Sequence, residues 1–236
     1  MQIARRPRSY VRVSGPDAES YLQRMVSNDV AAVPAGERCD ALLLTAKSRV
    51  IAPLVVLRRG PDDFLLLTEP ELGERVRAEL VRFRFAAKAE IEPEEHESWV
   101  VLGGEEALDE RPPGEEVGEE EYERWRVEAG IPRWGRELDD AILPAEAGLT
   151  ETHVSFTKGC YPGQEPIARL HYRGKVNRRL RRLVLEGEPV GEELALDGKV
   201  VGRITSRVGE RALGYVRTEV PEDAELRAGA AVARLH

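Results

Sequence analysis

One of the two cysteines, Cys160, lies among residue types that suit chemistry better than core packing. It belongs to the sequence KGCYPGQE (158–165), in which glycines stand close to the thiol on both sides. Glycine permits close approach of a ligand or a partner chain. A cysteine acts as a nucleophile or metal ligand when it is a thiolate, and nearby positive charge or a helix N-terminus favours that form. Lys158 supplies the charge, and Pro162 is typical of a first helical turn, so Cys160 is predicted to lie just before a helix. A buried, inert thiol is the alternative reading.

The remaining potential ligands are scattered. Cys39 precedes an apolar run and is expected to be structural. His153 could pair with Cys160, although a hydrogen-bonded surface histidine is the simpler reading. The chain has no C-x-x-C and no histidine pair at ligand spacing, so no metal site is predicted. One cysteine can contact an iron–sulfur cluster but cannot hold it alone.

A basic cluster follows the cysteine motif and surrounds His171 and Tyr172. It comprises Arg169, Arg173, Lys175, Arg178, Arg179, Arg181 and Arg182. On a chain of net charge −8, such a cluster could bind a polyanion, either a nucleic-acid backbone or the glutamate tail of a folate. It could equally pair with the acidic segment 105–123. The sequence leaves these alternatives open.

Composition restricts the class of protein. The chain has 236 residues, 42% of them hydrophobic and 33% charged, which fits a folded globular protein. No apolar run approaches the roughly 20 residues of a membrane span, and no signal-peptide core follows the N-terminus. We therefore expect a cytoplasmic protein without a membrane partner. Dinucleotide, P-loop and serine-hydrolase motifs are absent, which removes those enzyme classes.

The first two thirds of the chain indicate strands mixed with helices. Strands are expected at 9–13, 41–44, 50–57, 64–67, 89–91 and 98–102, with a helix after Pro16 and another over 69–84. The second helix is expected to begin with a capping box at Thr68 and Glu71. Residues 122–127 alternate like a further strand. After residue 178, short apolar runs separated by turn residues predict a small closed β-barrel or sandwich.

The motif KGCYPGQE resembles the signature of the YgfZ family, K-G-C-Y/F-x-G-Q-E, at every fixed position. The similarity extends to segments 14–29, 126–138, 143–149 and 199–206. The broader superfamily contains the aminomethyltransferase, or T-protein, of glycine cleavage. The resemblance implies an α+β fold of three parts around a central opening, two of them ferredoxin-like and the third a C-terminal β-barrel. We expect residues 1–40 with 120–177 to form a folate-binding body, 41–119 an inserted α+β domain, and 178–236 the barrel.

The resemblance also implies tetrahydrofolate as cofactor and iron–sulfur client or assembly proteins as partners, with an indirect effect on tRNA modification. Folate would occupy the central opening, with Cys160 at its edge and Lys158 keeping the thiol partly ionised. Glu128 matches the glutamate that meets the pterin in the T-protein, Trp125 is a stacking candidate, and Arg169 and Arg173 are candidates for the folate tail. The supporting motif positions are Gly159, Tyr161, Gly163, Gln164 and Glu165.

One departure separates the chain from the T-protein. The T-protein has an aspartate pair whose carboxylate acts on the folate nitrogen, and Ala52 and Pro53 stand at the equivalent place here. Aminomethyl transfer by the T-protein mechanism would lack the charged carboxylate that it needs. Whether the protein is an enzyme stays open. The alternatives to a YgfZ-type protein are a folate-dependent aminomethyltransferase and a non-enzymatic tRNA-binding module.

Overall fold

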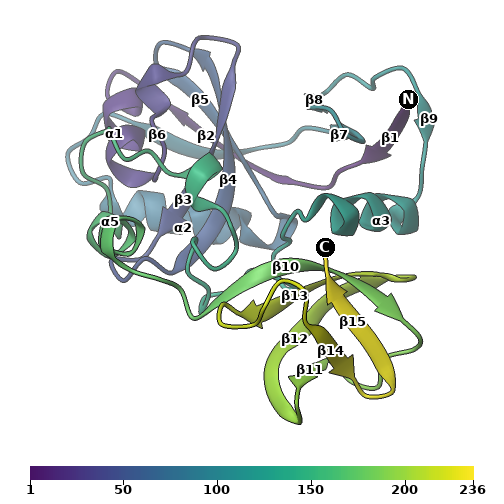
Figure 1. Cartoon of the computed structure of the whole chain (residues 1–236). Coiled ribbons are helices and arrows are strands. Elements are labelled where there is room, and N and C mark those ends of the chain that lie inside the picture. The colour runs from purple at the N-terminus through teal and green to yellow at the C-terminus, as the bar shows by residue number, and fades with distance from the viewer.

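The computed structural model describes all residues, 1–236, as three groups of strands with helices around them (Figure 1). The helices are α1 (Ala18–Met25), α2 (Gly73–Phe83), α3 (Glu119–Ala129), α4 (Thr150–His153) and α5 (Gln164–Arg173), with 3-10 turns at Val30–Ala32 and Pro70–Leu72. The strands of the first half are β1 (Gln2–Arg5), β2 (Ser9–Ser14), β3 (Arg38–Leu44), β4 (Val50–Gly60), β5 (Asp63–Thr68), β6 (Glu90–Glu94), β7 (Ser98–Val101), β8 (Glu106–Leu108) and β9 (Glu115–Glu116). The later strands are β10 (Arg178–Glu186), β11 (Glu193–Leu196), β12 (Lys199–Val208), β13 (Arg211–Arg217), β14 (Glu225–Ala228) and β15 (Ala231–Leu235). None of the helices combines the length and the apolar character that crossing a bilayer requires.

The largest sheet has five strands in the order β3-β4-β5-β2-β6. Side chains of a strand alternate between the two faces of a sheet, so neighbouring residues of β3 enter different cores. Ala41 and Leu43 pack with α1 and α2 in a cluster of 21 buried residues. Leu42 and Leu44 face the other way, into a cluster that contains Tyr161 of the cysteine motif. The motif segment is thus held against the sheet face opposite to α1 and α2.

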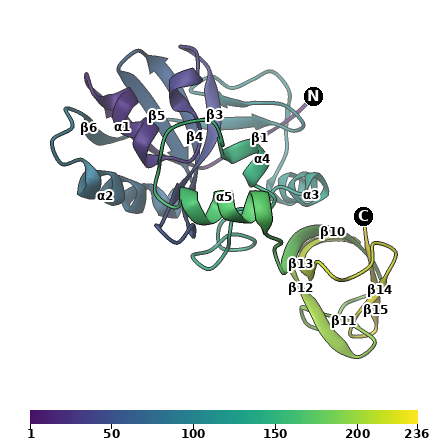
Figure 2. The ribbon, with the colours of Figure 1, turned by 60° about the vertical axis from the view of Figure 1, so that its left-hand side comes forward.

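A second, four-stranded sheet has the order β8-β7-β1-β9, and the C-terminal strands close a barrel in the order β10-β13-β12-β11-β14-β15. In Figure 1, α3 lies between the small sheet and the barrel, and it contacts β12 and β13. Figure 2 shows α5 running along the body toward the barrel, which the chain enters through residues 174–177. The expected fold class, α+β with a C-terminal barrel, is confirmed. The expected division into domains stays a prediction, and strands on both sides of residue 40 share the five-stranded sheet.

A buried ion network fixes α3 against the barrel. Arg126 is only 1% exposed, and it donates hydrogen bonds to Glu123, Glu137 and Ser206 of β12. Glu137 is also buried, and its carboxylate accepts a 2.6 Å hydrogen bond from the Ser206 hydroxyl. Tyr215 of β13 donates to the backbone oxygen of Glu137. Helix, loop and barrel are therefore joined through one arginine whose charge is fully paired.

Two local predictions were wrong. Residues 122–127 belong to α3 and are not a strand; Gly130, at φ 75°, ends the helix in the left-handed region that glycine tolerates. The capping box at Thr68 does not form, because the Thr68 hydroxyl instead donates across the sheet to the backbone oxygen of Pro53. The chain enters α2 through the turn that begins at Pro70.

Candidate functional site

The cysteine motif leaves its thiol exposed and anchors its neighbours. Tyr161 and Ile167 are buried in the cluster that contains Leu42 and Leu44, whereas Cys160 is a free, exposed thiol. The helix that follows, α5, begins at Gln164, two residues later than Pro162 suggested. Cys160 therefore lies four residues before α5 on a loop held by the side chain after it.

Gly163 is required by geometry. Its φ is 83°, in the left-handed region, and a Cβ there would lie 2.5 Å from the backbone oxygen of Thr45. The hydroxyl of Ser48 donates a 2.6 Å hydrogen bond to the Gly163 carbonyl. Gly159 has no atom within 4 Å of the corresponding Cβ position, so no packing requires glycine there. The second motif glycine thus fixes the loop onto the turn between β3 and β4.

Lys158 is hydrogen-bonded to the segment that follows α1. Its ammonium group donates to the backbone oxygens of Val26 and Asn28, at 2.8 and 2.6 Å. It lies 5.4 Å from the centre of the Tyr161 ring. Burial lowers the pKa of Lys158 to about 8, while the charge of Asp29 opposes that change. The ammonium therefore ties the motif to the end of α1, and Cys160 is not among its hydrogen-bond partners.

Cys160 opens into a shallow hollow of about 420 Å³. Gln164, Glu165 and Arg169 line it with the thiol, and their side chains make no hydrogen bond to the rest of the chain. These polar groups are free to meet a partner. The buried Tyr161 hydroxyl nearby has no hydrogen-bond partner, and burial raises its pKa to about 12.

A second and larger cavity, the central opening, lies between the five-stranded sheet, the four-stranded sheet, α3 and residues 147–153, with a volume of about 620 Å³. Three arginines line it, and all are paired: Arg6 with Glu69 at 2.5 Å, Arg8 with Glu106 at 2.8 Å and Arg38 with Glu105 at 3.0 Å. Burial opposes the ionisation of Glu106, but the hydrogen bond and charge of Arg8 outweigh it, so the pKa of Glu106 is lowered. These ion pairs form a charged but locally neutral wall.

Asp40 is a carboxylate of the central opening without a salt bridge. Cys39 and His153 line the same cavity. Burial raises the pKa of the Cys39 thiol to about 11, with the Asp40 charge adding to that effect. Burial lowers the pKa of His153, which Asp40 opposes, and a His153 ring nitrogen lies 2.7 Å from the hydroxyl of Thr152. The opening therefore holds a neutral thiol, a neutral imidazole and one free carboxylate. Nothing in the sequence around Asp40 singled it out, because its place depends on how β3 meets α4.

The structure distributes the predicted site residues over several surfaces. Trp125 lines the central opening, beside Tyr122 at a ring-centre distance of 5.7 Å. Glu128, at the end of the same helix, is exposed and lines a different hollow of about 180 Å³ with Arg182. Cys160 shares no lining residue with the central opening. The placement of Cys160 at the edge of that opening, beside the folate residues, stays a prediction.

The structure also locates the two residues that replace the T-protein aspartates and the two arginines proposed for the folate tail. Pro53 lines the central opening, and Ala52 is buried in the large core. Arg169 and Arg173 line a separate pocket between α5 and the loop of residues 143–150. The cations proposed for a folate tail thus stand on α5 and not in the opening.

Known proteins resemble this chain in sequence and in fold. Residues 177–236 match the family model described as CAF17, C-terminal beta-barrel domain. The mouse protein named iron-sulfur cluster assembly factor IBA57, mitochondrial, is 25% identical over 272 residues, covering 90% of this chain and 76% of the relative. The tRNA-modifying protein YgfZ of Edwardsiella ictaluri is 28% identical over 220 residues, covering 72% of this chain and 66% of the relative.

A solved structure shows the same fold. The glycine cleavage system aminomethyltransferase T from Bartonella henselae superimposes with a TM-score of 0.83 over 98% of this chain and 83% of its own, at 17% sequence identity. The resemblance to the YgfZ family, within the superfamily of the T-protein, is confirmed by these matches.

Proposed function

We propose that this protein binds tetrahydrofolate in the central opening and supports the assembly or repair of iron–sulfur proteins through Cys160. Its effect on tRNA modification would then be indirect, through iron–sulfur enzymes. The names of the relatives support this class of function. The observation that carries the role of the thiol is its position: Cys160 is free and exposed in a hollow of unengaged polar side chains.

The residues of the central opening suit a reduced folate. A volume of about 620 Å³ is within the range of small-molecule sites, about 300–1,000 Å³. Trp125 offers aromatic surface for a flat ring system, and the buried Tyr122 ring packs beside it. Asp40 offers a free carboxylate to the N–H groups of a pterin. Bound tetrahydrofolate supplies the capacity to carry a one-carbon unit. We assign Trp125, Tyr122 and Asp40 to its binding.

Cys160 acts on the outer side of the motif. A single thiolate supplies one ligand to a cluster, so the other ligands come from a client or assembly protein. Gln164 and Glu165 flank the thiol with unpaired polar groups that a partner surface can meet. Because the hollow and the opening share no lining residue, folate and the partner protein can be bound at the same time.

Calorimetry with tetrahydrofolate tests the placement of the cofactor. Trp125→Ala should weaken binding about tenfold, the equivalent of about 1.4 kcal/mol, through lost aromatic contact. Arg227→Met, on β14 of the barrel, serves as the control and should bind like the wild type. Glu128→Ala tests the residue that the resemblance implied. Wild-type affinity of Trp125→Ala would refute the assignment to the opening.

Complementation tests the thiol. In a strain that lacks the protein and has lost activity of an iron–sulfur enzyme, Cys160→Ala should fail to restore that activity at normal expression, whereas Cys39→Ala should restore it. Full restoration by Cys160→Ala would contradict the proposed role.

A folate-dependent aminomethyltransferase is the second candidate, and Asp40 is the observation that favours it. Pro53 occupies the position of the missing aspartate, but Asp40 brings a carboxylate to the same cavity. Tetrahydrofolate-dependent cleavage of an aminomethyl substrate, lost in Asp40→Asn, would establish this activity.

A further inference from the structure

The pocket beside α5 combines unpaired cations with an apolar floor. It has a volume of about 400 Å³ and lies between α5 and the loop of residues 143–150. The cations are Lys47, Arg169 and Arg173, and no aspartate or glutamate lines the pocket. None of the three forms a salt bridge, in a protein whose arginines are mostly paired. An acidic chain has thus left three positive charges uncompensated around one cavity.

The carboxylates nearest in the chain do not neutralise these cations. Glu146 follows the pocket-lining Ala145, but it pairs with Arg178 at 3.0 Å and accepts a hydrogen bond from the Leu143 backbone N–H. Glu165 lies one helical turn before Arg169, the usual spacing for a pair, and both line the Cys160 hollow, yet no salt bridge joins them. The positive charge of the pocket is therefore available to a ligand.

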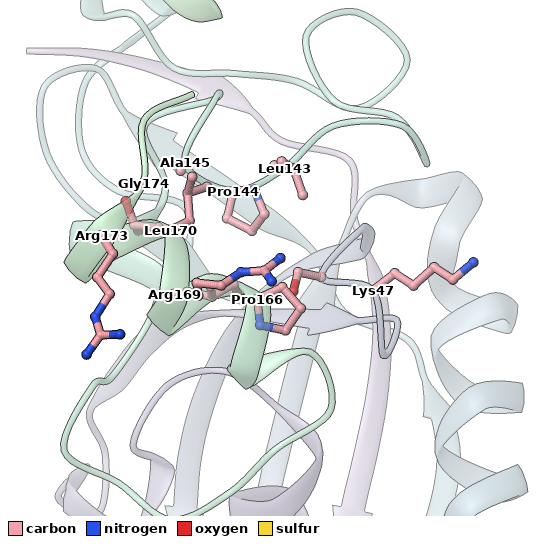
Figure 3. A pocket seen from close by; sticks show the side chains of 12 residues that line it. Lys47, Leu143, Pro144, Ala145, Pro166, Arg169, Leu170, Arg173 and Gly174 are labelled. Carbon is pink, nitrogen blue, oxygen red and sulfur yellow. The ribbon is translucent and has the colours of Figure 1, made fainter. Parts of the chain in front are cut away.

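Figure 3 shows how the cations are arranged. Arg169 directs its guanidinium across the pocket, between Pro144 and Pro166, whereas Lys47 and Arg173 extend outward on opposite sides. Guanidinium binds carboxylate or phosphate through two parallel hydrogen bonds. Arg169 is placed to be the anchor, and the two outer cations attract negative charge toward it.

The floor of the pocket requires an apolar body in the ligand. It is formed by Leu143, Pro144 and Ala145 on the loop and by Ile167 and Leu170 on α5. A fully hydrated ion would leave this surface unused. A volume of about 400 Å³ corresponds to a small molecule, for which sites of about 300–1,000 Å³ are usual.

We propose that this pocket binds a small organic anion, with a carboxylate or phosphate on Arg169 and an apolar body against Pro144 and Leu170. Arg169 and Pro166 also line the hollow of Cys160, so the ligand is bound directly beside the thiol. Occupation of the pocket would change the charge that a partner of Cys160 meets. This site is distinct from the central opening and does not depend on folate binding.

Displacement of the fluorescent probe anilinonaphthalene sulfonate tests the proposal. The competitors are 2-naphthyl phosphate, 2-naphthoate and neutral 2-naphthol. They share the naphthalene ring, so charge is the main difference between them. Both anions should displace the probe at concentrations about tenfold lower than naphthol, as expected for a charge-assisted hydrogen bond. Whichever anion is tighter identifies the source as a phosphate or a carboxylate.

Arg169→Met keeps the side-chain stem and removes the charge. It should weaken both anions about tenfold and leave naphthol unchanged. Arg227→Met is the matched control, because Arg227 is exposed on β14 without a salt bridge and far from this pocket in the chain. Equal competition by naphthol, or wild-type affinity for the anions in Arg169→Met, would overturn the proposal. Competition by triglutamate but by neither naphthyl anion would also overturn it, by assigning the site to an acidic peptide.

Discussion

Replacing Gly163 by alanine should destabilise the protein far more than the same change at Gly159 in the same motif. At φ 83°, Gly163 has a backbone conformation that costs an L-residue about 1–2 kcal/mol. The new Cβ would also lie 2.5 Å from the Thr45 oxygen and 3.1 Å from the Ser48 Cα, both of them backbone atoms. Neither neighbour can rotate away, so the turn between β3 and β4 must shift, and such overpacking costs about 1–3 kcal/mol.

The two effects together predict a loss of about 3 kcal/mol in the free energy of unfolding for Gly163→Ala. For a chain of this size, that loss lowers Tm by about 6–12 °C. Gly159→Ala should stay within about 0.5 kcal/mol, because its Cβ would meet nothing within 4 Å. Urea unfolding followed by circular dichroism measures both variants. Equal unfolding midpoints for the two variants would refute the geometric account of the motif.

Three further predictions concern buried charge and the central opening. Arg126→Met leaves the Glu137 carboxylate buried without its partner and should lower the free energy of unfolding in urea by about 3–5 kcal/mol. The control, Arg124→Met on the exposed side of α3, should lower it by less than about 1 kcal/mol. Equal losses in the two variants would contradict the role of the buried network. Burial holds the pKa of Lys158 at about 8, below its ordinary 10.5, so the unfolded chain binds the proton more readily between those values. The difference in free energy of unfolding between the wild type and Lys158→Met, measured by urea titration, should therefore rise from pH 8 to 10.5. A difference that stays constant over this range would contradict the lowered pKa of Lys158. Asp40→Asn should weaken tetrahydrofolate binding about tenfold in calorimetry, and unchanged affinity would place the pterin away from Asp40.

The motif and the barrel were predictable because their signals are local. Most barrel strands appear in the sequence as short apolar runs between turn residues, although no such run marks β14 (Glu225–Ala228). The helix after Pro162 was predicted with a start two residues early. The requirement for glycine at position 163 was not predictable, since it depends on a turn more than a hundred residues earlier in the chain.

The false strand at 122–127 has a physical cause. The buried face of α3 includes Arg126, so the apolar stripe that marks a helix is interrupted by a charge. That charge is tolerated because Glu137, eleven residues away, neutralises it. Without this pairing in view, alternating polar and apolar residues favour a strand. The acidic first turn at Glu119–Glu121 was the signal for a helix N-terminus.

The candidate site was only partly predictable for the same reason. The sequence identified Cys160, Trp125 and the cations of α5, but the folded chain places Trp125 in the central opening and Cys160, with Arg169, in a separate hollow beside α5. Asp40 joins Trp125 only because β3 and α3 border the same cavity. Spacing along the chain cannot reveal such a meeting.

The Arg126 network limits how the barrel could be exchanged between proteins of this fold. The barrel is a self-contained closed sheet, and as a module it could be transplanted between relatives. If a transplanted barrel had no hydroxyl at position 206, the buried Arg126 and Glu137 would each lose one hydrogen-bond partner. Chimeras that carry α3, the loop to Glu137 and the barrel together should fold, whereas those joined at residue 177 alone should be impaired in proportion to the mismatch at this seam.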